Sequence, residues 1–221
     1  MRRPIVLAHI LAILILLLTG PAALAVSVTE AVFDANLLRP VTSPQTFRYR
    51  YELKGKTIPE PYLGQASMEV REIAADGEKK VFFDLFEGEA RRELGPIAAS
   101  DQNPMLLVFL QLDVNEMANL TGGAAGYFQQ QVRKAFNEEA EAEAVEVEIG
   151  GQMIMAQRLR MRPFRNDPQI ERFPAFRDKI YEFVVARSVP GGLVRIAATT
   201  PDPVTGELFL EKSMNFVAVG P

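Results

Sequence analysis

Residue types that support nucleophilic or metal-assisted catalysis are nearly absent from this chain. The sequence contains no cysteine, and its single histidine, His9, lies in an apolar N-terminal stretch. Without that stretch the chain has no means to build a Ser-His-Asp triad, a Cys-His pair or a zinc site with histidine or thiolate ligands. We therefore expect no catalytic residue, no metal site and no cofactor.

Carboxylates are the remaining side chains able to do acid–base chemistry or to bind a cation. Six glutamates crowd into residues 138–148, but this run lacks the alternating Asp or Asn ligands and the pivot glycine of a calcium loop. A solvated helix end and strand face explains it better. Asp101, Asp113 and Glu116 are explained by helix capping, so we assign none of them an acid–base role.

Arginines alternate along the stretch that follows the acidic run, at Arg158, Arg160 and Arg162. Arginines in this arrangement are able to bind an anionic ligand. Cross-strand pairing with the glutamates is the simpler explanation, and we favour it.

Apolar residues without a polar face are the last candidates for a site. Met105 to Leu110 is apolar all round, so as a helix it is either wholly enclosed in core or lines an apolar cavity. Methionines on a later strand add adaptable apolar surface, although ordinary core explains them as well. The candidate ligand-binding residues are Met105, Leu106, Phe109, Leu110, Met153, Met155, Leu159 and Met161.

The N-terminus has the pattern of a cleavable secretory signal peptide over residues 1–25. Two arginines precede an apolar run from Ile5 to Leu18, which is shorter than the roughly 20 residues that span a bilayer. Ala23-Leu24-Ala25 then places the cleavage before Val26. Cleavage would take the formal net charge from −4 to −6, which argues against nucleic acid as a partner. We expect residues 26–221 to form one domain with no transmembrane segment.

Alternating apolar and polar residues predict strands in the first part of that domain. Phe47, Tyr49, Tyr51 and Leu53 share one parity, and similar patterns follow near residues 66–71 and 81–85. Asp76-Gly77 marks the turn between the last two. The chain thus opens as an antiparallel meander.

The period changes to helical at about residues 103–139. Asn103-Pro104 is typical of a helix start, and Asp113 with Glu116 suggests a capping box for a second short helix that Gly122-Gly123 ends. A third helix follows, with Phe128, Val132, Ala135 and Phe136 on one face. We expect three short helices packed on one face of the sheet.

A second meander closes the chain. We predict a three-residue turn, Gly150 to Gln152, that pairs Ile149 with Met153 and keeps the arginines away from Val145 and Val147. Val189-Pro190-Gly191-Gly192 then predicts a type II turn between the strands near 179–186 and 193–200, and a last strand covers 208–219. The total is about eight strands in an α+β fold with a strongly curved antiparallel sheet.

The order of these elements, with the stretches Tyr51-Glu52-Leu53-Lys54-Gly55 and Leu63-Gly64-Gln65, resembles the periplasmic half-barrel superfamily of lipoprotein carriers and receptors (LolA/LolB-like), including uncharacterised bacterial envelope proteins. That resemblance implies a half-barrel whose helical insert packs on the concave face, and an apolar cavity that holds acyl chains or other lipids. It carries over no individual residue.

Two hypotheses about function follow. The first is a non-catalytic periplasmic binding or carrier protein for lipid or another hydrophobic small molecule. The alternative is a structural or interaction protein of the cell envelope, with a self-filled core and an envelope protein as its partner. A void of roughly 300 Å³ or more under Met105 to Leu110 would favour the first, and native packing density there would favour the second.

Overall fold

A computed structural model describes residues 36–220 of this chain, apart from residues 57 and 139. The expected signal peptide, residues 1–25, lies outside the described residues. Among the described residues, no helix is long and apolar enough to cross a membrane.

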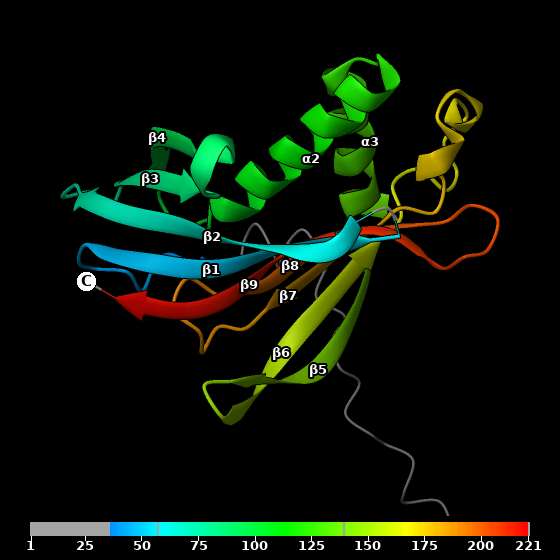
Figure 1. Cartoon of the computed structure of the whole chain (residues 1–221). Helices are drawn as coiled ribbons and strands as arrows, with labels where there is room; N and C mark the ends of the chain where they lie inside the picture. Colours follow the sequence, from blue (N-terminus) through cyan, green and yellow to red (C-terminus); the bar gives the residue numbers. More distant parts are fainter. Residues whose placement is uncertain (1–35, 57, 139, 221) are drawn as a thin grey trace, which may run out of the picture.

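Nine antiparallel strands form one curved sheet with the spatial order β4-β3-β2-β1-β9-β8-β7-β6-β5 (Figure 1). The strands are β1 (Gln45–Gly55), β2 (Ile58–Ile73), β3 (Lys79–Leu85), β4 (Arg92–Ala99), β5 (Glu141–Ile149), β6 (Gln152–Met161), β7 (Ile180–Val185), β8 (Leu193–Pro201) and β9 (Leu208–Gly220). Each meander is built from neighbours in sequence, and β9 pairs with β1 to join the two. The α+β fold with a curved antiparallel sheet, expected from the change of period, is confirmed, and so is the half-barrel that the resemblance implied.

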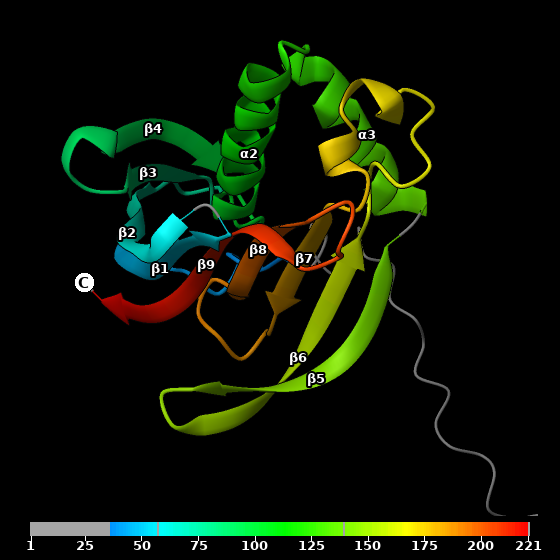
Figure 2. The same cartoon turned by 45° about the vertical axis from the view of Figure 1, so that its right-hand side comes forward.

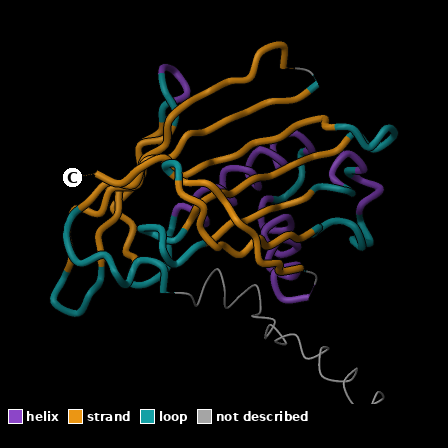
Figure 3. Tube along the Cα trace, turned by 90° about the horizontal axis from the view of Figure 1, so that it is seen from below, coloured by secondary structure: helices purple, strands orange, loops and turns teal. Residues whose placement is uncertain are grey.

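Two helices, α2 (Met105–Thr121) and α3 (Ala125–Glu138), lie on the concave face of the sheet. Figure 2 shows the same arrangement from a second side, and Figure 3 views the sheet from the side away from the helices. Short 3-10 turns, η1 (Gly88–Ala90), η2 (Ile170–Arg172) and η3 (Pro174–Phe176), complete the elements. The insert therefore packs where it was expected to pack.

The core lies between the concave face and the helices. Inward-facing strand residues such as Phe47, Tyr49 and Phe183 form one continuous cluster with Met105 and Phe128 from the helices. Burying these aromatic side chains supplies a large share of the apolar area that holds the two layers together.

The start of the insert is fixed by Asn103, as expected. Its Oδ1 accepts a hydrogen bond from the backbone N–H of Met105 at 3.0 Å, while its Nδ2 donates to the carbonyl oxygen of Gly191 at 2.7 Å. Gly191 sits in the predicted turn with φ +73°, and the Gly192 N–H donates to the Val189 carbonyl oxygen. One side chain thus ties the helix start to the β7–β8 turn.

The expectation of two short helices over residues 104–120 is wrong, because α2 runs unbroken from Met105 to Thr121. Asp113 is not a cap there but a buried residue in mid-helix. The helix ends at Gly122, which has φ +65° and supplies the left-handed C-terminal conformation.

The three-residue turn expected after β5 is also wrong. Ile149 pairs with Gln152, and Gly150 and Gly151 alone connect the strands, with φ of +59° and +80°. Two successive positive φ values are the requirement of a type I′ turn, which only residues such as glycine meet easily. On the face that carries Val145, Val147 and Ile149, charge and apolar residues are separated along the hairpin instead, because the pair Glu143 and Arg158 lies nearer its base.

Strand β4 was not expected at all. Its sequence carries Gly95-Pro96 in the middle, which breaks the alternating pattern. Proline has no N–H to donate to a neighbouring strand, so it is tolerated mainly in edge strands, and β4 is one of the two edges of the sheet.

Candidate functional site

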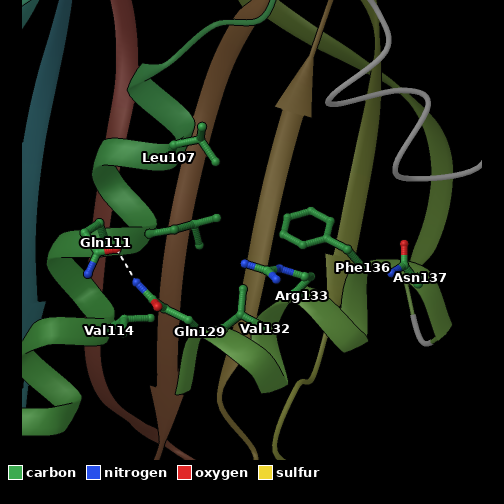
Figure 4. A pocket seen from close by; sticks show the side chains of 9 residues that line it. Leu107, Gln111, Val114, Gln129, Val132, Arg133, Phe136 and Asn137 are labelled. Carbon is green, nitrogen blue, oxygen red and sulfur yellow. Dashed lines mark hydrogen bonds between the residues drawn. The ribbon is translucent and has the colours of Figure 1, made fainter. Parts of the chain in front are cut away.

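A groove of about 500 Å³ lies between α2 and α3 (Figure 4). Its lining is apolar at the base and polar at the rim. The lining residues are Leu107, Leu110, Gln111, Val114, Gln129, Val132, Arg133, Phe136 and Asn137. The volume falls within the range of small-molecule binding sites in proteins.

The apolar wall of the groove follows from the composition of the two helices. α2 carries apolar side chains on nearly every side. Met105 and Phe109 pack in the main core, whereas Leu107 and Leu110 lie on the side that faces α3. α3 is amphipathic, and its buried face supplies Val132 and Phe136. The ring of Phe136 also packs against Phe183 of β7, with centroids 5.2 Å apart, which seats α3 on the sheet.

Polar side chains rim the groove. The amide of Gln129 on α3 donates a hydrogen bond to Oε1 of Gln111 on α2, so one bond crosses between the helices, as the dashed line in Figure 4 shows. Gln111 in turn donates to Asn115 at 2.7 Å. Arg133 is exposed at the rim, and no ion pair to its guanidinium exists within the described part of the chain.

The residues proposed from the sequence as one cavity lining lie in three places. Leu110 belongs to the main core cluster and also lines the groove between the helices. Met105, Leu106, Phe109, Leu159 and Met161 are buried in the main core cluster. Met153 and Met155 are 60% and 62% exposed on the outer part of the β5–β6 hairpin, so the expectation that they point into the protein is wrong.

The methionine error has a simple origin. Met153 and Met155 share the parity of Leu159 and Met161, so alternation assigned all four to one face. β6 pairs with β7 only from Gln157 onward. Residues before that point extend past the sheet, and parity alone does not reveal where the core ends.

The sequence analysis missed a buried ionic cluster under α2. The carboxylate of Asp113, 2% exposed, accepts hydrogen bonds from Lys212 at 3.0 Å and from the Tyr181 hydroxyl at 2.5 Å, and it forms a salt bridge with Lys179 at 2.9 Å. Lys212 also contacts Glu116 of α2. This cluster links α2 to β7 and β9 through charged hydrogen bonds.

The electrostatics of the cluster favour an ionised Asp113. Burial by itself raises the pKa of this carboxyl, but the two lysines and the Tyr181 hydroxyl outweigh burial and hold the pKa at about 2. Burial lowers the pKa of Lys179 and raises that of Tyr181 well above its usual value. Because each charge has a partner, the cluster acts as a structural clamp rather than a reactive site.

Strand parity contained a signal for this cluster. Lys179 shares parity with inward-facing Tyr181, and Lys212 shares parity with inward-facing Met214. Two lysines on a core face require a buried acid opposite them, and Asp113 lies four residues after the core residue Phe109 on α2.

Two of the three arginines of the ladder pair with glutamates, as favoured, and one of these partners, Glu143, belongs to the acidic run. Arg158 forms a salt bridge with Glu143 at 3.0 Å, and Arg160 with Glu182 of β7 at 2.8 Å. Within the described ranges, no group of three or more His, Asp or Glu side chains is placed to hold a metal ion.

No protein-family profile and no curated protein sequence matches the chain. Among solved structures it is similar to the lipoprotein LppX of Mycobacterium tuberculosis, with 10% identity and a TM-score of 0.35, over 86% of this chain and 92% of that one.

Two further structures are similar. A putative outer membrane lipoprotein-sorting protein domain from Vibrio parahaemolyticus matches with 8% identity and a TM-score of 0.24, over 89% of this chain and 91% of that one. A LolA superfamily protein from Nitrosomonas europaea matches with 12% identity and a TM-score of 0.20, over 88% and 93%. The half-barrel of this chain is established by its own sheet topology.

Proposed function

We propose that this chain is a non-catalytic binding or carrier protein of the periplasm, and that it holds a lipid or another hydrophobic ligand in the groove between α2 and α3. The groove is the observation that supports the proposal, because it combines an apolar base with a polar rim in a volume suited to a small ligand. Export through the expected signal peptide is part of this proposal.

The energetics of the proposed site favour an apolar chain. Each methylene moved from water into contact with Leu107, Leu110, Val132 and Phe136 contributes about 0.8 kcal/mol. Arg133 and the two glutamines at the rim offer donors to a polar head group. The apolar part of the ligand therefore supplies affinity, and the rim supplies orientation.

A lipid-uptake assay tests the proposal with a matched pair of leucines on α2. Leu107 lines the groove and is 49% exposed, while Leu120 lies outside the groove and is 68% exposed. Leu107→Glu should weaken the uptake of a fluorescent fatty acid about tenfold or more, because the acyl chain of the ligand would have to remove water from the introduced carboxylate. Leu120→Glu should bind like the wild type.

Two outcomes of that assay would reject the proposal. One is a wild-type protein that takes up no fluorescent fatty acid at micromolar concentration. The other is equal binding by both leucine variants, which would move any lipid site away from the groove. In either case we would prefer the alternative role, a structural or interaction protein of the envelope. The closely packed core around Met105 and Phe109 is consistent with that alternative role.

A further inference from the structure

The β5–β6 hairpin extends beyond the rest of the sheet. β7 pairs with β6 only from Gln157 to Met161, so residues 152–156 of β6 and their partners 145–149 of β5 form a two-stranded arm. Figures 1 and 2 both show this arm leaving the sheet on the side away from the helices. We call residues 145–156 the β5–β6 arm.

The arm is held in place by its apolar underside. Val145, Val147, Ile149 and Ile154 pack against a second apolar cluster on the convex side of the sheet, which includes Val184. The arm is therefore a preformed element whose position does not depend on a bound partner.

The outer edge of β5 offers an open row of backbone hydrogen-bonding groups. β5 is the last strand of the sheet, and within the described part of the chain it pairs with β6 alone. All nine of its residues keep an extended conformation up to the glycine turn. Such an edge is a template for one more strand.

The outer face of the arm has a definite chemistry. Glu146 lies opposite Met155, and Glu148 lies opposite Met153, with all four side chains exposed. Glu143, nearer the base, is neutralised by Arg158, whereas no basic group of the described residues lies within ion-pair distance of Glu146 or Glu148. The face therefore presents two unneutralised carboxylates beside the open edge.

We propose that the β5 edge is a docking site for an extended segment of a partner protein in which basic residues alternate with apolar ones. The added strand would pair with the free backbone groups of β5. Its lysine or arginine side chains would lie beside Glu146 and Glu148 on the outer face, where opposite charges across strands are stabilising. Its apolar side chains would extend the underside formed by Val145 and Val147.

A second copy of this chain does not meet these requirements. β5 contains no lysine or arginine, so in an antiparallel β5–β5 pair with matched faces Glu146 and Glu148 would lie opposite alanines or the glutamates of the other copy. Like charges placed directly opposite destabilise a strand pair. The charge pattern thus selects a basic partner and disfavours self-association.

Peptide binding to the full-length mature protein tests the proposal. The probes are a nine-residue fluorescent peptide alternating lysine and valine, the same peptide with glutamate in place of lysine, and a lysine peptide N-methylated at alternate amides. Fluorescence anisotropy should show binding of the lysine peptide only. N-methylation along one edge should weaken it about tenfold or more, because it removes the backbone hydrogen bonds of an added strand.

Charge reversal in the protein provides the matching test. The double variant Glu146→Lys, Glu148→Lys should lose affinity for the lysine peptide about tenfold and gain affinity for the glutamate peptide. The control variant Glu87→Lys, Glu89→Lys makes the same charge change at exposed positions near η1 and should behave as wild type. Thermal unfolding of each variant establishes that the fold is intact.

Three outcomes would overturn the proposal. Equal binding of the N-methylated peptide would mean attraction to charge without strand addition. Equal loss in the control variant would mean a general effect of net charge. Absence of lysine-peptide binding would mean that Glu146 and Glu148 serve only to prevent other strands from pairing with the β5 edge. Fatty-acid uptake in the groove should be unchanged in the charge-reversed variant, which separates this test from that of the proposed function.

Discussion

Asp113 is the centre of the ionic contacts between α2 and the sheet. It is the shared partner of Lys179, Lys212 and Tyr181, and all four side chains are buried. A buried ion pair gives little net stability compared with apolar residues, but removal of one partner leaves the others uncompensated. The cluster therefore fixes the position of α2 more than it adds to its stability.

Asp113→Ala should accordingly cost about 3–5 kcal/mol of unfolding free energy, because two buried ammonium groups lose their main counter-charge. Urea unfolding followed by circular dichroism measures the loss. Glu116→Gln serves as the control, since Glu116 is 45% exposed and its bond to Lys212 lies at the edge of the cluster. A control loss as large as that of Asp113→Ala would contradict the central place given to Asp113.

The lowered pKa of Asp113 determines how the stability of the protein depends on pH. This pKa is about 2 in the folded protein, below the value of about 4 in an unfolded chain. A lowered pKa contributes stability that is complete above pH 4 and is lost as the pH falls through 2. The two-unit difference corresponds to about 3 kcal/mol. Unfolding free energies measured between pH 5 and pH 2 should fall less steeply for Asp113→Asn than for the wild type, and identical slopes would refute this assignment.

At the scale of elements, local patterns predicted most of the fold. Alternation and turn signals predicted eight of the nine strands, and the face of α3 formed by Phe128, Val132, Ala135 and Phe136 is buried as expected. Two of the failures, the missed β4 and the turn after β5, have local causes. β4 carries a Gly-Pro pair that hides its alternation, and the turn after β5 depends on the φ angles of two glycines, which composition does not determine.

Two glycines of the helical insert differ in the backbone conformation they supply. Gly122 has φ +65°, which other residues adopt at a cost, whereas Gly126 lies inside α3 with open space where a Cβ would be. Gly122→Ala should therefore destabilise the protein by about 1 kcal/mol. Gly126→Ala should stabilise it by about 0.5–1 kcal/mol through helix propensity.

Thermal unfolding of the two alanine variants checks this contrast directly. The midpoint should fall for Gly122→Ala and rise for Gly126→Ala. A midpoint that does not fall for Gly122→Ala would mean that the α2–α3 connection does not need a left-handed residue, and one that falls for Gly126→Ala would contradict the helix-propensity argument. Fatty-acid binding should change little in Gly126→Ala, because Gly126 does not line the groove.

At the scale of the molecule, the candidate site depends on tertiary arrangement that sequence patterns did not contain. The apolar character of Met105 to Leu110 indicated a helix that is either enclosed in core or lines a cavity, and in the structure all of these residues are buried except Leu107, which is 49% exposed at the groove. The groove, however, forms on the other side of that helix, where α3 lies beside it. Its position is set by how the two helices cross the sheet, and only Leu110 of the expected lining residues contributes to it.

The arrangement of the molecule also determines how a ligand would enter. The hydrogen bond between Gln129 and Gln111 crosses the groove, so a ligand that enters between α2 and α3 must break it or pass beside it. A covalent link at this point should block entry if the helices must separate. The natural chain has no cysteine, so two introduced thiols can be linked without competing reactions.

The variant Gln111→Cys, Gln129→Cys should bind a fluorescent fatty acid while its thiols are free and lose most of that binding after treatment with a short bifunctional thiol reagent. The link replaces a hydrogen bond worth about 1 kcal/mol with a covalent bond. The two helices can then no longer move apart at this point. The variant blocked at each thiol with a monofunctional reagent of similar size is the control for bulk. Undiminished uptake by the linked protein would mean that the ligand enters without separation of the helices, from the rim at Arg133 and Asn137, where the groove is already open.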